Sequence, residues 1–534
     1  MRRIGRWMKP ALAGVVALAA LSSALVGAAR ADVLALVIGI DDYKYLAKLE
    51  GAVNDARDIA EALVASGARE VTRLTDGEAT RDAILGAWKA LLAKAAPDDS
   101  LVLAYAGHGG VDRTWLLAGF ASDGRDSGQR LPGYELAALL QTAAPHPVLV
   151  VADTSHGTAI ARPVDPRVGR LGVRTATYPA ITSDALPPPD PTVARLDIQY
   201  LDHVTVLTAA RGDEPALEVE LDDRAHGALS WAFVRALRGA ADADGNGVLS
   251  KSELDQFICA NVRMRLEGRQ HPQVFPTGRG DATLVPALPP AAEPPMSAGM
   301  SSMTGAGLPP AQLLPLRVIN APGVDPITFY AQLSGTVPAD RGSTGKASPL
   351  RLTWDDAAGD MVNGLGDVVA TLPEETEAGT AHRHLQGVVD KWALLRRLER
   401  DAERRSLAMA LEPGDQLHRA GDTVTLVVGG NRARHLTVLA LAADGAVRLV
   451  QPTGREAAVP DTDAPFRLPL IIEPPFGAGH YVVIASPEPL AALHRDLKAL
   501  DGKPAATELA ALLDRHLTGH SYQLGVHGVY TGPR

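Results

Sequence analysis

The chain has 534 residues, which at about 150 residues per domain predicts two or three domains. Its 46% hydrophobic and 21% charged residues are typical of a globular protein and exclude wholesale disorder. The net charge of -10 argues against binding to nucleic acid, which requires a basic surface. With one cysteine, Cys259, the chain can form neither an internal disulfide framework nor a cysteine-rich metal site.

The first 31 residues have the pattern of an export signal. Several basic residues are followed by an uncharged run over Ala11–Ala29, and Ala29-Arg30-Ala31 is typical of a signal-peptidase cleavage site. We therefore expect a signal peptide over 1–31 and a periplasmic or secreted protein. The alternative is an uncleaved anchor, because the run is about long enough to span a bilayer, although its Ala and Ser residues make it weakly apolar. No later stretch is long and apolar enough to span a membrane.

Residues 32–288 alternate short apolar runs with helical patterns, which predicts an α/β domain with a mainly parallel sheet flanked by helices. The expected strands lie at 33–40, 101–106, 148–152 and 204–207. Helices are expected at 54–64 and 79–94, between the first two of these runs.

The rest of the chain differs in composition. Residues 289–315 are rich in Pro, Ala, Gly and Ser and are predicted to form a linker. We expect 316–410 to be an irregular and helical connecting region, strand-poor up to residue 375, with a charged amphipathic helix over Ala381–Arg405. Alternating runs and Gly-rich turns predict a smaller β-rich accessory domain over 411–534. Its expected strands are Thr423–Val428, His435–Leu441, Ala446–Val450 and His480–Ser486.

Two of the apolar runs in the first half end in turns that carry reactive side chains. His108 lies in Gly107-His108-Gly109-Gly110, and Ser155 lies in Asp153-Thr154-Ser155-His156-Gly157. Open parallel sheets bind their ligands at the carboxyl ends of the strands. If the two strands are neighbours, His108 and Ser155 meet there, with backbone N–H groups near Gly109 to stabilise an oxyanion. Spacing alone favours a structural role for His108.

Longer motifs resemble the caspase and metacaspase-like peptidase domains of bacteria. The resemblance covers about 33–285, and its motifs follow the order of the family. They are Leu36-Val37-Ile38-Gly39-Ile40, Gly51-Ala52-Val53-Asn54-Asp55-Ala56, Tyr105-Ala106-Gly107-His108-Gly109, Leu207-Thr208-Ala209-Ala210, His226-Gly227-Ala228 and Gln270-His271-Pro272-Gln273. The resemblance implies that His108 is the catalytic histidine and that Ser155 stands where the family has its catalytic cysteine.

This exchange of nucleophile bears on activity. A cysteine with a pKa of ~8.5 is partly ionised at neutral pH beside a histidine, whereas a serine hydroxyl needs an oriented base, which a third group usually holds in place. Cys259 cannot substitute, because it lies in a helical stretch and faces a predicted core. We therefore expect a catalytically impaired pseudo-peptidase. The alternative is an active endopeptidase that uses Ser155 and His108.

Two carboxylates are candidates for substrate binding. In metacaspase-like enzymes, the aspartates that match Asp55 and Asp153 line an acidic pocket for an Arg or Lys side chain. Carboxylates around a guanidinium make strong charge-assisted hydrogen bonds. The structural alternatives are a helix N-cap for Asp55 and a strand-end turn for Asp153. If the pocket is intact, the partner is a peptide or protein with basic residues.

Residues 242–253 fit the twelve-residue calcium loop of an EF-hand, with helical patterns on both sides. The predicted ligands are Asp242, Asp244, Asn246, Val248 through its carbonyl, Ser250 and Glu253. Ca²⁺ is the one cofactor that the sequence suggests. The alternative is a Gly-rich acidic turn that binds no metal.

The sequence also gives an expectation for a loop in the first half and for the β-rich region. Residues 162–193 are predicted to form a long loop, which by the same resemblance can carry a processing site, although no scissile bond can be chosen. The region around 411–490 loosely resembles a domain of unknown function that often follows bacterial caspase-like domains.

A third functional alternative is an envelope scaffold with a closed cleft. A solvent-filled pocket at Asp55 and Asp153 would argue against this alternative.

Overall fold

The computed structural model describes residues 31–534 with gaps. The residues that it does not describe are 1–30, 111–112, 124–125, 158–161, 170, 179–180, 182–183, 185, 187–188, 277–280, 290–312, 320–332, 339–346, 373–376, 430–434 and 452–464. The predicted signal peptide and almost all of the predicted linker therefore lie outside the described residues. Within the described part of the chain, no helix is both long enough and apolar enough to cross a membrane.

A six-stranded sheet forms the core of the first half of the chain, in the order β12-β8-β6-β3-β1-β2. The strands from β8 to β2 are parallel, and β12 is antiparallel at one edge. Their bounds are β1 Val33–Gly39, β2 Glu70–Thr75, β3 Ser100–Ala106, β6 Val148–Asp153, β8 Val204–Thr208 and β12 Gln273–Phe275. The α/β class and the four predicted strands are thus confirmed.

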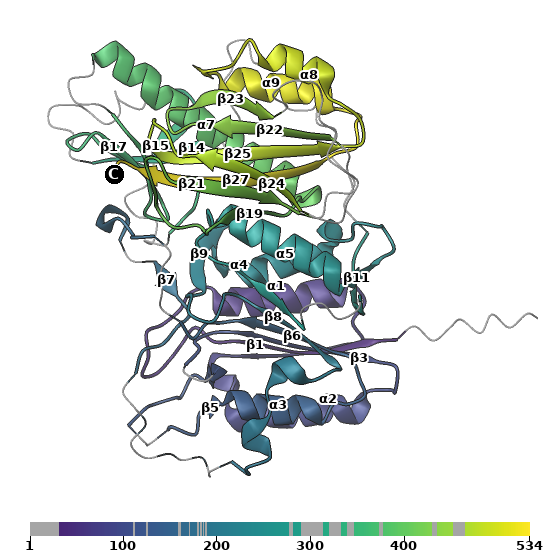
Figure 1. Cartoon of the computed structure of the whole chain (residues 1–534). Coiled ribbons are helices and arrows are strands. Elements are labelled where there is room, and N and C mark those ends of the chain that lie inside the picture. Colours follow the sequence, from purple (N-terminus) through teal and green to yellow (C-terminus); the bar gives the residue numbers. More distant parts are fainter. Residues whose placement is uncertain are drawn as a thin grey trace, which may run out of the picture. The chain divides into compact units, whose positions relative to one another are not determined.

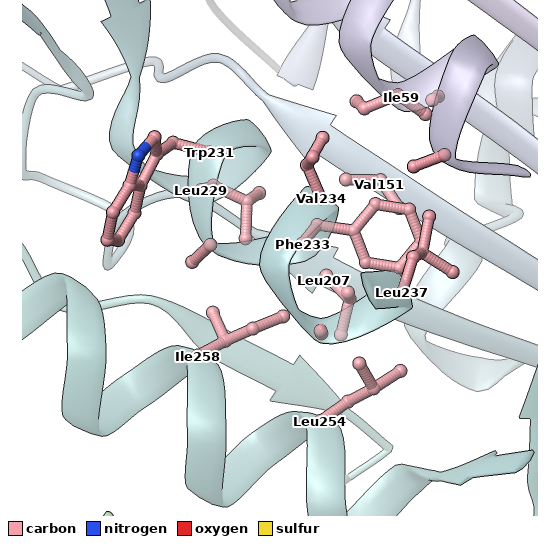
Figure 2. Packing of buried hydrophobic residues seen from close by; sticks show 14 of the residues in the cluster. Ile59, Val151, Leu207, Leu229, Trp231, Phe233, Val234, Leu237, Leu254 and Ile258 are labelled. Atoms are coloured by element: carbon pink, nitrogen blue, oxygen red, sulfur yellow. The ribbon is translucent and has the colours of Figure 1, made fainter. Parts of the chain in front are cut away.

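Both faces of this sheet are buried, which explains why its strands are near-continuous apolar runs in the sequence. All residues of β1 are buried, and its side chains alternate between two separate core clusters. One cluster is covered by α1 Ala52–Ala65, α4 Ala228–Arg235 and α5 Lys251–Arg265, and the other by α2 Arg81–Lys94 and α3 Gly133–Gln141 (Figure 1). Figure 2 shows Phe233 of α4 packed among apolar side chains of α1, α5 and the sheet.

Shorter elements connect or extend these layers. A π-helical turn, Ala236–Ala240, follows α4. The small sheets contain β4 Trp115–Leu116 with β5 Arg130–Leu131, β7 Gly172–Val173 with β9 Leu217–Leu221 and β10 Arg224–Gly227, and β11 Val248–Ser250 with β13 Thr283–Pro286. Single 3-10 turns lie at Asp76–Glu78, Pro166–Val168, Val193–Arg195 and Ile198–Tyr200.

Residues 316–375, which we predicted to be strand-poor, instead contribute to a five-stranded sheet in the order β15-β14-β16-β17-β18. Its strands are β14 Leu314–Ile319, β15 Thr336–Pro338, β16 Leu352–Asp355, β17 Asp360–Asn363 and β18 Val368–Thr371. The prediction was wrong because most of these strands have only three or four residues, too few to display an alternating pattern. Gly359 and Gly366 interrupt the pattern further, and the structure places both in turns with positive φ.

The predicted charged helix is present as α7, Ala378–Arg404. Beyond it, the chain is rich in strands as predicted, with β19-β21-β24 in one sheet and β20-β27-β25-β22-β23-β26 in another. The bounds are β19 Met409–Glu412, β20 His418–Arg419, β21 Thr423–Val428, β22 His435–Leu441, β23 Ala446–Gln451, β24 Phe466–Ile471, β25 Gly477–Ser486, β26 Lys503–Pro504 and β27 Gln523–Gly532. Two helices, α8 Ala491–Leu497 and α9 Ala506–Leu517, were not predicted. They pack with α7 and the six-stranded sheet in one hydrophobic core.

Candidate functional site

The register of the central sheet brings His108 and Ser155 to the same edge. β3 and β6 are neighbours, and Ala106 at the end of β3 pairs with Asp153 at the end of β6. His108 and Ser155 each lie two residues beyond these strand ends, and both are buried. The condition on which the sequence argument depended, that the two strands be adjacent, is therefore met.

The His108 ring is held in one orientation by two contacts. Its Nε2 lies 2.8 Å from the backbone oxygen of Ala47, so Nε2 carries the proton and donates it. The ring also packs on Tyr43, with the two centroids 4.7 Å apart. Nδ1 then carries the lone pair. It is buried, and among the residues that the structure describes it has no hydrogen-bond partner. Burial lowers the pKa of His108 from its ordinary value of 6.5, which keeps the ring neutral. A neutral imidazole with a free lone pair has the form of a general base.

The Ser155 hydroxyl makes its hydrogen bonds elsewhere. Its Oγ accepts the backbone N–H of Ala216 at 2.7 Å and lies 2.5 Å from Oγ1 of Thr175. Thr175 donates its only hydroxyl proton to the backbone oxygen of Gly157 at 2.8 Å, so Ser155 must be the donor to Thr175. Between the described side chains of Ser155 and His108 there is no hydrogen bond.

Asp55 and Asp153 lie together in a buried pocket, and Glu218 of β9 is a third carboxylate in it. All three side chains are fully buried. The interpretation of Asp55 as a helix N-cap is wrong, because Gly51 is the N-cap of α1. Asp55 instead accepts a hydrogen bond from the Nδ1 of His226 at 2.8 Å.

The guanidinium of Arg174 fills this pocket. Its Nη2 contacts Asp55 and lies 3.4 Å from Glu218, while its Nη1 lies 3.2 Å from the carboxylate of Asp153. The side chain of Arg174 is completely buried. Burial raises the pKa of Asp153, and the positive charge of Arg174 opposes that rise. One cation among three carboxylates leaves the pocket with an excess of acidic groups, so its chemistry selects a cation.

The backbone around Arg174 is bound as an extended strand. β7 pairs antiparallel with β9, and the N–H of Arg174 donates to the oxygen of Ala216 at 2.9 Å. The carbonyl oxygen of Arg174 accepts the N–H of Gly109 at 2.9 Å and lies 3.5 Å from the backbone nitrogen of Ser155. Gly109 must be glycine here, because a Cβ would lie 2.2 Å from the backbone oxygen of Ser155. The Arg174–Thr175 peptide group thus lies on two N–H groups that can stabilise an oxyanion.

Comparison with known proteins gives the family of the first half of the chain. Residues 32–281 match the family model described as the caspase domain. This part of the chain is a caspase domain. Over 102 residues, the chain is 40% identical to metacaspase-1 of Eremothecium gossypii, an alignment that covers 17% of this chain and 22% of that protein.

Solved structures that resemble the caspase domain have lower sequence identity. A protein from Geobacter sulfurreducens is 20% identical with a TM-score of 0.33, over 47% of this chain and 95% of that one. Caspase-1 from Spodoptera frugiperda is 14% identical with a TM-score of 0.32, over 48% of this chain and 93% of that one.

The predicted calcium loop follows the π-helical turn at Ala236–Ala240 and includes the first three residues of α5. One carboxylate oxygen from each of Asp242, Asp244 and Glu253 lies within 4.8 Å of the others. Asp242 accepts the backbone N–H groups of Asn246 and Gly247, which folds the loop around it. The remaining predicted ligands have other contacts: Asn246 accepts the N–H of Val248, and Ser250 is the N-cap of α5 in a capping box with Glu253.

Cys259 lies in α5, as predicted, and is half-buried. Its sulfur lies 3.2 Å from a carboxylate oxygen of Asp255 and 3.4 Å from the backbone oxygen of Pro272, either of which can accept the single thiol proton. Burial raises the pKa of the Cys259 thiol, and the Asp255 charge adds to that effect, so the thiol stays protonated at neutral pH. This environment agrees with the prediction that Cys259 is not a nucleophile.

Three residues of the caspase-domain site were not predicted in their roles. Glu218 lies in β9, and nothing in its sequence neighbours indicates a pocket. Ala47 acts through its backbone oxygen, which leaves no trace in residue type. Arg174 lies in the loop predicted at 162–193, where several arginines alternate with Pro and Gly, so its role depends on a contact with Asp55 over 119 residues.

Proposed function

We propose that the caspase domain recognises an arginine within an extended peptide and holds it without rapid cleavage. The observation that carries this proposal is Arg174 itself, whose guanidinium lies between Asp55 and Asp153 while its carbonyl accepts the Gly109 N–H. Residues 172–176 are bound in the way an added β-strand is bound, with backbone hydrogen bonds for affinity and a side-chain pocket for specificity.

The reason for slow cleavage is the state of the nucleophile. Ser155 donates its hydroxyl proton in a hydrogen bond to Thr175, so this proton does not point toward His108 for transfer. A serine hydroxyl is a weak nucleophile unless an adjacent base accepts its proton. We therefore propose an impaired peptidase, exported through residues 1–31, whose partners are peptides or proteins with basic residues. Such a partner must displace Arg174, because the pocket is filled and not open to solvent.

A second function, endopeptidase activity after arginine, is favoured by a specific observation. The Nε2 contact with Ala47 orients His108, which is the third-group support that a serine nucleophile needs. In this reaction, Oγ of Ser155 would bond to the Arg174 carbonyl carbon as its proton passes to Nδ1 of His108. The bond to the Thr175 nitrogen would then break, with the proton going to that amine, and water would hydrolyse the resulting ester.

A binding measurement tests the proposed recognition. The probe is a fluorescein-labelled peptide with the sequence of residues 171–176, Leu-Gly-Val-Arg-Thr-Ala, and the control peptide has glutamine in place of arginine. The Arg174→Ala chain is expected to bind the arginine peptide at least about 30-fold more tightly than the glutamine peptide, since leaving buried charges unpaired costs about 2 kcal/mol or more. Equal binding of the two peptides would contradict the proposal.

We also propose that the loop over 242–253 binds Ca²⁺, on the basis of its ligand pattern and the three clustered carboxylates. Calcium at about a hundredfold above its dissociation constant is expected to raise Tm by about 5 °C, and EGTA to reverse the shift. Asp244→Asn, which keeps the shape of this exposed side chain, is expected to abolish the shift. A natural chain whose Tm does not respond to millimolar Ca²⁺ would contradict this proposal.

A further inference from the structure

Residues 162–174 lead to the buried pocket that Arg174 fills. The upstream end of this segment is held by the C-terminal region (residues 313–534). Arg162 is the centre of this anchor. Its guanidinium contacts the carboxylate of Asp367 at 2.9 Å and donates to the backbone oxygens of Asp415 at 2.7 Å and Glu267 at 2.6 Å. It also stacks on the ring of Tyr530, at 3.9 Å from the centroid. Asp367, Asp415 and Tyr530 all belong to the C-terminal region.

Asp367 joins the segment to both parts of the chain. Its carboxylate pairs with Arg162 of the segment and with Arg269, which lies within the caspase domain. The Arg269 guanidinium also donates to the backbone oxygens of Arg162 and Pro163. The three charged side chains are at most 3% exposed, so Asp367 is a buried single anion between two buried cations. Removing its charge leaves both cations unpaired.

The anchor continues for five more residues. Asp165 donates its backbone N–H to the oxygen of Gly366 at 2.9 Å. The guanidinium of Arg167 contacts Asp355 at 3.1 Å and Asp360 at 3.0 Å, both in the C-terminal region. Arg167 is 20% exposed, so this pair is closer to solvent than the pair at Asp367.

Only four residues separate Arg167 from β7, and a chain cannot extend more than about 3.6 Å per residue. Fixing residues 162–167 on the C-terminal region therefore restricts β7 and Arg174 to the neighbourhood of the pocket. A short tether of this kind keeps an intramolecular ligand at a high effective concentration, which an outside peptide must overcome.

The backbone that bonds Arg174 on its other side is also connected to the C-terminal region. Ala216, which bonds both Ser155 and Arg174, follows Glu214 by two residues. Glu214 contacts Nδ1 of His271 at 2.9 Å, and the Nε2 of that ring contacts Asp415 at 2.5 Å. Asp415 thus connects two parts of the site. Its carboxylate ends the buried series of contacts that runs from Glu214 through His271, and its backbone oxygen accepts a hydrogen bond from Arg162.

We infer that the C-terminal region regulates access to the arginine pocket, by clamping residues 162–167 so that Arg174 stays bound in the cleft of the caspase domain. The inference rests on the proposed function, because it concerns the same pocket. Loosening the clamp lengthens the free loop that carries Arg174, from Ser155 onward, and lets an outside basic peptide compete. The C-terminal region is then a regulatory element in the same chain.

Clamp variants of the full chain test this inference with the labelled peptide Leu-Gly-Val-Arg-Thr-Ala. Asp367→Asn keeps the size of the side chain and removes its charge, and Arg167→Gln weakens the more exposed contact. Both are expected to bind the peptide about 10-fold or more tightly than the natural chain, because the effective concentration of Arg174 falls. Arg467→Gln is the matched control. It breaks an exposed ion pair with Glu412 that is not among the described contacts of residues 162–167, and is expected to bind as the natural chain does.

The Arg174→Ala chain separates the two possible failures. If it binds the peptide tightly while both clamp variants bind as weakly as the natural chain, the clamp is wrong and the proposed function stands. If it does not bind the peptide, the proposed function fails, and the inference with it. Should Asp367→Asn fail to fold, as judged by its circular dichroism and melting curve, the result from Arg167→Gln decides.

Discussion

The Ser155→Cys chain is expected to cleave itself between Arg174 and Thr175. The carbonyl oxygen of Arg174 already accepts the N–H of Gly109, and the preceding residue, His108, is a base held in one orientation. The missing component is therefore a nucleophile that reacts without prior proton transfer. A sulfur atom cannot keep the 2.5 Å contact that Oγ makes with Thr175, and a thiol is a weak hydrogen-bond donor. The thiol should therefore leave Thr175 and ionise beside His108.

Intact-mass spectrometry of residues 32–534 measures this directly, as the appearance of fragments 32–174 and 175–534. We expect cleavage at least on the order of a thousandfold faster than in the natural chain, given that losing a nucleophile can cost about a millionfold. The controls Ser155→Cys/His108→Ala and Ser155→Cys/Arg174→Ala should stay intact. An intact Ser155→Cys chain would show that the cleft has lost productive geometry. Rapid cleavage of the natural chain that disappears in Ser155→Ala would establish the serine endopeptidase instead.

Arg174→Ala is expected to destabilise the protein by about 3–5 kcal/mol near neutral pH, because it leaves three buried carboxylates without their cation. The effect should be smaller at pH 5. Without Arg174, the pKa of Asp153, already raised by burial, rises further. The folded state then binds more protons than the unfolded state, so its stability falls as the pH rises.

Urea titration at pH 5 and pH 7.5 measures this difference. N-ethylguanidinium, which fits the space that the Arg174 side chain leaves, should restore part of the lost stability at millimolar concentration. N-ethylacetamide, similar in size but uncharged, is the control. A stability loss that is the same at both pH values, with no rescue by the guanidinium compound, would indicate a packing role for Arg174 only.

The sequence predicted the parts of the site that depend on local pattern. His108 and Ser155 follow buried apolar runs, and parallel strands bring their carboxyl ends together, so the two residues could be paired once the strands were taken as neighbours. For Asp55, the pattern left a pocket and a helix cap equally open. The structure excludes the cap, because Gly51 is the N-cap of α1 and the helix begins at Ala52, two residues before the predicted start at residue 54.

What the sequence could not predict depends on contacts between distant segments. Arg174 meets Asp55 over 119 residues, and Arg162 meets Asp367 over 205. Both arginines lie in a loop that has no periodic pattern, where any of several arginines could have been chosen. The short strands around Asp367 were missed for a related reason, since each is stabilised by its neighbours in the sheet and not by its own propensity.

The most direct test of the account is the chemical accessibility of Arg174 in the folded natural chain. Phenylglyoxal modifies exposed guanidinium groups, and digestion followed by mass spectrometry gives the rate at each arginine. We expect Arg174 to stay unmodified while the exposed Arg238 reacts, and Arg174 to become reactive in Arg167→Gln. Modification of Arg174 in the natural chain at the rate of Arg238 would contradict the claim that the caspase domain holds its own arginine in the pocket.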